Sequence, residues 1–98
     1  MLDRPREEWD GRARRAVRSD VPTVLRSGPY RFYFYSSDRY EPPHVHVSRE
    51  ANEAKFWLDP VRLAWSRGFS ATELRKIEAI VAENVQEFMK AWNAFFSR

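Results

Sequence analysis

The sequence contains no cysteine, which excludes disulfide bonds and metal sites built on thiolates. It also lacks an apolar run long enough to cross a bilayer, and residues 1–20 lack the apolar region of a signal peptide. The net charge of +3 comes from scattered arginines and not from a basic tract, so it permits nucleic-acid binding without requiring it. We therefore expect a cytoplasmic protein that has no membrane partner.

What the chain does contain is enough apolar surface for one core. Of its 98 residues, 43% are hydrophobic and 15% are aromatic. Residues 1–20 differ from the rest, because they carry six arginines against five acidic residues and few large apolar side chains. We expect them to form a charged extension that is flexible or loosely helical, followed by a single domain over residues 21–98.

The order of strand, turn and helix patterns predicts the fold class. Alternating or aromatic-rich segments separated by turn residues predict strands over residues 23–25, 30–35, 44–48, 53–58 and 62–66. Asn52 is the turn residue expected to take a positive φ. Ser70 and Glu73 form a capping-box motif, and apolar residues at three- and four-residue steps then predict a helix over residues 71–96. The prediction is an α+β domain, in which an antiparallel meander of four to five strands packs on one long C-terminal helix.

Period-two alternation divides the strand residues between two faces of the sheet. The core face, expected against the helix, comprises Phe32, Phe34, Val45, Val47, Ala54, Phe56, Leu58, Leu63 and Trp65. The second face, expected toward solvent, comprises Arg31, Tyr33, Tyr35, His44, His46, Ser48, Glu53, Lys55, Trp57 and Arg62. Residues of the second face can bind phosphate and stack on bases.

Both histidines lie in the stretch 40–47, directly after a Pro-Pro pair, and three interpretations of them compete. A metal site needs three or four ligands, so Glu41, Asp38 or Glu53 would have to complete it, and the sequence fixes none of their distances. Acid–base catalysis on a phosphodiester would use His44 or His46, with Arg31 or Lys55 holding the phosphate. A structural role would leave the imidazoles hydrogen-bonded to the loop and packed on Tyr33 or Trp57. We expect neither a bound metal nor a cofactor.

Candidate site residues follow from these faces. Any catalysis, of a metal-independent ribonuclease type, would use Arg31, His44, His46 and Lys55, which we expect to converge on one phosphate. The nucleic-acid-binding candidates are Tyr33, Tyr35, Trp57 and Arg62. Near the end of the helix, Trp92, Phe95 and Phe96 are candidates for a homodimer or partner interface, because a small sheet is expected not to cover them. Alanine at Arg31, His44 or Lys55 is expected to leave the melting temperature nearly unchanged.

The sequence resembles the Domain of Unknown Function 4160 family of small bacterial proteins over about residues 21–96. The resemblance is carried by residues 22–24, 30–35, 41–47 and 54–58 and by the helix over residues 74–96. It implies a partner from a second small family, Domain of Unknown Function 2442, and a toxin-like role in a type II toxin–antitoxin module. From the second face of the sheet we expect this toxin-like component to act on RNA. The alternative is a non-catalytic interaction module that complexes with its operon partner.

Overall fold

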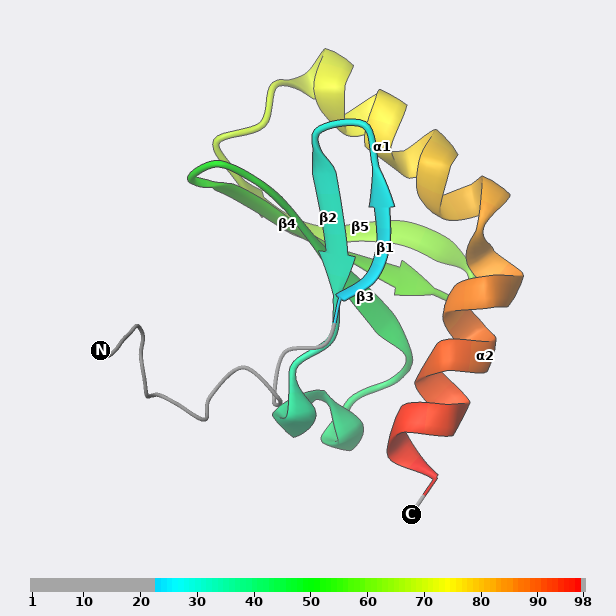
Figure 1. Ribbon diagram of the computed structural model, residues 1–98. Helices are drawn as coiled ribbons and strands as arrows, with labels where there is room; N and C mark the ends of the chain where they lie inside the picture. The colour runs from blue at the N-terminus through cyan, green and yellow to red at the C-terminus, as the bar shows by residue number, and fades with distance from the viewer. Residues whose placement is uncertain (1–22, 98) are drawn as a thin grey trace.

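The computed structural model describes residues 23–97, and the expected N-terminal extension lies outside them. Five strands pair as an antiparallel meander in the order β1-β2-β3-β4-β5. Their bounds are β1 Thr23–Ser27, β2 Tyr30–Tyr33, β3 His44–Arg49, β4 Asn52–Leu58 and β5 Val61–Arg67, and the 3₁₀ helix η3, Ser36–Tyr40, interrupts the connection from β2 to β3. Two helices follow, α1 Ala71–Glu83 and α2 Val85–Phe96 (Figure 1). The predicted α+β class is confirmed.

The C-terminal helix differs from the prediction of one continuous element. It is divided at Asn84, which adopts φ −112° and ψ 15° and donates its side-chain amide to the Ile80 carbonyl at 2.8 Å. Figure 1 shows that the chain changes direction between α1 and α2 and that both helices lie along the same side of the sheet. A straight helix over residues 71–96 would be about 39 Å long at about 1.5 Å per residue. Because the chain bends, both helical segments can pack on a sheet of five short strands.

The core lies between the core face of the sheet and both helices. Phe32, Val45, Val47, Ala54, Phe56 and Leu58 from the sheet are buried together with Ile77, Val81, Phe88 and Trp92 from the helices. The rings of Phe32 and Phe88 lie 5.5 Å apart and join β2 to α2. Among the described residues, no helix is long and apolar enough to cross a membrane.

The sequence placed Leu63 and Trp65 together on the core face, and this is wrong for Trp65. Lys55 pairs with Trp65 whereas Phe56 pairs with Leu63, so a bulge inserts one extra residue into β5. Trp65 therefore lies beside Lys55 on the second face, 40% exposed. Leu63 keeps its predicted face but is 39% exposed, because β5 is an edge strand.

The turn between β3 and β4 also differs from the prediction. Arg49 pairs with Asn52, which leaves Glu50 and Ala51 as a two-residue hairpin loop. Such loops require a positive φ at the first central residue, and Glu50 adopts φ 57° while Asn52 begins β4. Beyond β5, Gly68 takes φ 96°, a backbone conformation that favours glycine, and a Cβ there would also clash with the Asn52 side chain.

Candidate functional site

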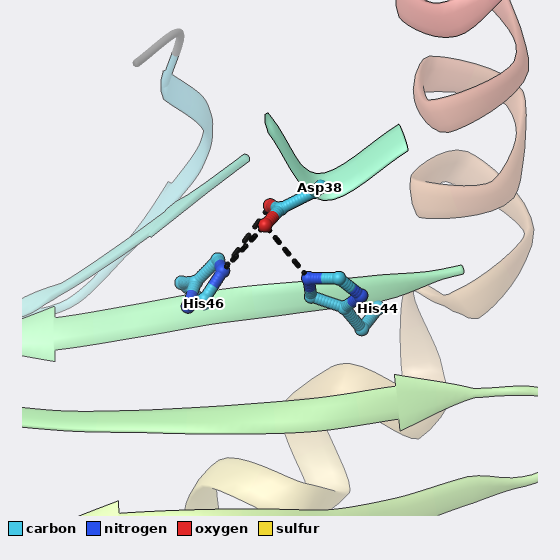
Figure 2. Close-up of side chains that lie close together, drawn as sticks. All are labelled: Asp38, His44 and His46. Carbon is cyan, nitrogen blue, oxygen red and sulfur yellow. Dashed lines mark hydrogen bonds and ion pairs between the residues drawn. The ribbon is translucent and has the colours of Figure 1, made fainter. Parts of the chain in front are cut away.

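The two histidines lie on the second face of β3, as the alternation predicted, but they are not exposed to solvent. His44 is 0% exposed and His46 is 5% exposed. The reason is η3, which folds back over β3 and places the buried Asp38 against both rings (Figure 2). The expectation that His44 and His46 lie on an open surface is therefore wrong. Because His44 is buried, His44→Ala should lower the melting temperature, contrary to the expectation from the sequence.

Asp38 lies between the two histidines, and we call Asp38, His44 and His46 the buried cluster. Its Oδ1 lies 3.1 Å from His44 Nε2, and its Oδ2 lies 3.1 Å from His46 Nε2. The same Oδ2 accepts the Tyr35 backbone N–H at 2.7 Å, which fixes the carboxylate at the start of η3. Burial alone would raise the pKa of Asp38, but the two imidazoles and the Tyr35 amide outweigh it and hold the pKa well below its ordinary value. Asp38 is therefore a carboxylate at neutral pH.

Each histidine also has a neighbour on its other side. The His44 Nδ1 lies 2.9 Å from the Pro42 carbonyl oxygen, and its ring lies 5.2 Å from the Trp92 ring on α2. His46 stacks on Tyr33, with the ring centroids 5.5 Å apart, and its Nδ1 lies 4.0 Å from Glu53 Oε2. Packed on every side, both imidazoles have defined orientations.

Glu53 forms a second polar centre beside the histidines. Its Oε2 accepts hydrogen bonds from the Tyr33 hydroxyl at 2.7 Å and from the Tyr35 hydroxyl at 3.2 Å. Burial, followed by the hydrogen bond to Glu53, raises the pKa of the Tyr33 hydroxyl far above its ordinary value. Because both phenol groups face Glu53 and Tyr33 is only 4% exposed, Tyr33 does not offer its ring to a base.

The remaining catalytic candidates do not converge on one phosphate. Strand pairing places Arg31 opposite Ser48, His44 opposite Trp57 and Lys55 opposite His46, which are three different rows of the sheet. The Arg31 Nε donates to Thr23 Oγ1, and its guanidinium lies over the Tyr33 ring. The Lys55 ammonium donates to Glu41 and lies 4.7 Å from the centre of the Trp57 ring. The expected convergence is wrong, since it assumed neighbouring strands but not their register.

The residues expected at a partner interface are partly inside the protein. Trp92 is 7% exposed and contacts Phe34, with ring centroids 5.3 Å apart, so the sheet side of the molecule does cover it. Phe95 and Phe96 are partly buried, and both rings lie 6.1 Å from Phe34. Partner binding through the partly buried Phe95 and Phe96 stays a prediction.

An open part of the second face lies over β4 and β5. Trp57 pairs with the exposed Arg62, and Lys55 pairs with the exposed Trp65. Two tryptophans and two cations thus occupy one side of two neighbouring strands, and we call these four residues the Trp–Arg surface. The sequence placed Trp57, Arg62 and Lys55 on this face but assigned Trp65 to the core face. The alternating residue pattern of β5 does not indicate the bulge that moves Trp65 to the second face.

Comparison with known proteins identifies a family. A family model described as Domain of unknown function (DUF4160) matches residues 30–93, which include every residue of the buried cluster and of the Trp–Arg surface. No curated protein and no solved structure matches the chain. Because the matched region covers more than half of its 98 residues, the chain belongs to the DUF4160 family.

Proposed function

We propose that this protein binds single-stranded RNA through the Trp–Arg surface, as the toxin-like component of a cytoplasmic two-protein toxin–antitoxin module. The observation that carries the RNA-binding proposal is the bulge in β5, which puts Trp65 on the same face as Trp57, Lys55 and Arg62. Aromatic rings stack on bases of any sequence, and cations beside them contact the phosphate backbone. The toxin role and the cognate antitoxin-like partner rest on the family resemblance alone.

The proposal is binding without cleavage. His44 and His46 are 0% and 5% exposed, and both Nε2 atoms face Asp38. A general base must come within hydrogen-bond distance of the hydroxyl group it deprotonates. Neither imidazole offers a nitrogen to a phosphodiester at the surface, so the histidines support the fold of the second face and do not attack RNA.

Fluorescence anisotropy with a labelled single-stranded RNA tests the binding. Base–aromatic stacking is worth about 1–3 kcal/mol per base, so Trp65→Ala and Trp57→Ala should each weaken binding by about tenfold. Leu63→Ala is the matched control, because Leu63 is as exposed as Trp65 on the same strand but belongs to the core face. Equal affinity of the two tryptophan variants and the wild type would refute the proposed surface.

A second candidate function, capture of a partner protein, is favoured by the position of β5. This strand is at an edge of the sheet and carries two exposed large apolar residues, Leu63 and Trp65. An edge strand offers its backbone groups to a strand of a second chain. Leu63→Glu separates the functions: it should weaken capture of the protein encoded by the neighbouring gene and leave RNA affinity unchanged.

The toxin role is tested in cells. Expression of this chain alone should slow growth, and co-expression of the neighbouring gene should restore it. If growth inhibition persists in the Trp57→Ala and Trp65→Ala variants at equal protein level, then inhibition does not depend on the Trp–Arg surface.

A further inference from the structure

The buried cluster of Asp38, His44 and His46 contains nitrogen atoms that hydrogen bonding does not satisfy. Within the described residues, His44 Nε2 and His46 Nδ1 are buried and have no hydrogen-bond partner. An unsatisfied buried polar group costs about 1–3 kcal/mol. Two of them on adjacent rings of one strand require a physical explanation.

The first nitrogen, His44 Nε2, lies where a cation would be stabilised. The Pro42 carbonyl can only accept a hydrogen bond, so the His44 Nδ1 at 2.9 Å must carry the proton. With this proton on Nδ1, His44 turns Nε2 toward the Asp38 Oδ1 at 3.1 Å. Two such acceptor atoms in a buried space repel unless a positive centre, either a second proton or a metal ion, lies between them.

The His46 ring is oriented toward the same carboxylate. The His46 Nε2 lies 3.1 Å from Asp38 Oδ2, and its Nδ1 lies 4.0 Å from Glu53 Oε2. The Nε2 atom, which faces Asp38, is therefore the His46 nitrogen that a metal ion would take. Metal-bound histidines commonly have this arrangement, with one nitrogen toward the ion and the other toward a carboxylate or a carbonyl. Here the Pro42 carbonyl supplies that outer group for His44, whereas Glu53 lies 4.0 Å from His46 Nδ1, too far for a hydrogen bond.

We propose that Asp38, His44 and His46 bind a divalent transition-metal ion of the zinc class, through one carboxylate oxygen and the two Nε2 atoms. The three residues offer ligand atoms that all lie within 4.8 Å of one another. Ligands about 2.0–2.1 Å from a tetrahedral zinc ion lie about 3.3 Å apart, and the Asp38 Oδ1 lies 3.1 Å from His44 Nε2 and 3.4 Å from His46 Nε2. Two imidazoles and one carboxylate suit zinc or iron(II) better than magnesium or calcium.

The ion would have a structural role. Asp38 comes from η3, and both histidines come from β3, so the ion joins the loop before β3 to the sheet (Figure 2). All three ligands are buried, which leaves a fourth position to a water molecule and no opening for a large substrate. The sequence named Asp38 as one of three possible third ligands but fixed none of their distances, so no metal was expected; the fold of η3 brings Asp38 to the histidines.

Metal content and zinc binding of the purified full chain test the proposal without any RNA. We expect about one equivalent of zinc-class metal per chain by mass spectrometry. After chelation, zinc at about 100 times its Kd should raise the Tm by about 10 °C or more. Asp38→Asn keeps the side-chain size and removes the charged ligand, so it should weaken zinc binding at least tenfold in calorimetric titration.

The matched control is Glu50→Gln, which removes an exposed carboxylate at the far end of β3 and should leave zinc affinity unchanged. If Asp38→Asn does not fold, the visible spectrum of the wild type loaded with cobalt(II) decides. Strong absorption typical of a four-coordinate ion supports the site, and the weak spectrum of hydrated cobalt overturns it. A wild type with no stoichiometric metal and no zinc-dependent Tm also overturns it, and protons would then hold the cluster together.

Discussion

Glu73 connects the first turn of α1 to two strands. Its Oε2 accepts hydrogen bonds from the Tyr30 hydroxyl and from Arg49 Nε, each at 2.7 Å, and its Oε1 accepts one from Arg49 Nη2 at 3.0 Å. Ser70 caps the Glu73 amide at 3.1 Å, as the capping-box motif predicted. The glutamate side chain turns to Arg49 and Tyr30 in place of the Ser70 amide, since a two-bond contact with a guanidinium is stronger than a neutral cap.

The acid stability of the protein should therefore depend on Glu73. The hydrogen bonds from Arg49, followed by that from Tyr30, hold its pKa below the ordinary value of 4.5. A carboxyl group with a lowered folded-state pKa stabilises the fold above its unfolded pKa and loses that contribution as the pH falls through the folded value. We expect Glu73→Gln to be less stable than the wild type at pH 7, and the difference to shrink below about pH 4.5.

Urea unfolding at several pH values measures this difference. Glu78→Gln is the control, because Glu78 is an exposed carboxylate on the same helix. A difference between Glu73→Gln and the wild type that stays constant from pH 7 down to pH 3 would contradict the role assigned to the ion pair.

For the individual residues of the site, the sequence could predict the face of the sheet but not the burial. Period-two alternation was sufficient to place His44 and His46 on one face of β3. The burial of these residues was not predictable, since it depends on η3 bringing Asp38 back over a strand that begins six residues later. Asp38 was named only as one of three possible third ligands, because no local pattern fixes how a loop of this length folds.

At the scale of elements, α2 completes the core at the end of the sheet. Trp92 lies between Phe34, which follows β2, and His44, which begins β3. The Phe96 ring lies 4.3 Å from the Trp92 ring and covers it from the next turn of the helix. The apolar periodicity predicted this stripe correctly, whereas the exposure expected for its last turn was wrong for Trp92 because α2 turns at Asn84 toward the sheet.

We expect Trp92→Ala to destabilise the protein by about 3–5 kcal/mol, the usual cost of removing a large buried aromatic side chain. Asn93→Ala, which changes an exposed residue of the same helix, should alter the free energy of unfolding by less than about 0.5 kcal/mol. Chemical denaturation compares the two variants directly. A loss below about 1 kcal/mol for Trp92→Ala would mean that α2 contributes little to the core and that its aromatic residues are available to a partner.

In strand β5, the alternation of residues predicts the face of each side chain before the bulge but not after it. Alternation assigned nearly every strand residue to its observed face, from Phe32 on β2 to Arg62 on β5. One inserted residue reverses the side of everything that follows it, and Trp65 follows it. A bulge at this position is decided by how β5 fits β4, which is a tertiary effect without a sequence signal here.

For the whole molecule, the second face of the sheet divides into a closed and an open part. Over β2 and β3 the tyrosine and histidine rings lie beneath η3 and are occupied by Asp38 and Glu53. Over β4 and β5, Arg62 and Trp65 are exposed and Arg67 lies beside them, paired with Glu53 at 3.4 Å. The closed part is therefore filled by its own polar contacts, and the open part is where we propose that a nucleic acid binds.

If RNA binds as we propose, charge and stacking on the open part should make separable contributions to the affinity. For single strands, the slope of log K against log salt is about −0.7 per phosphate contact, so two or three contacts from Arg62, Lys55 and Arg67 predict a slope of about −2. Arg62→Ala should reduce its magnitude by about 0.7, because it removes one contact. Trp65→Ala should lower affinity at every salt concentration and leave the slope unchanged, since stacking releases no counterions.

Anisotropy titrations at several salt concentrations measure both quantities. If Arg62→Ala leaves the slope unchanged, the phosphate backbone runs elsewhere on the protein, and the Trp–Arg surface is not the RNA-binding site.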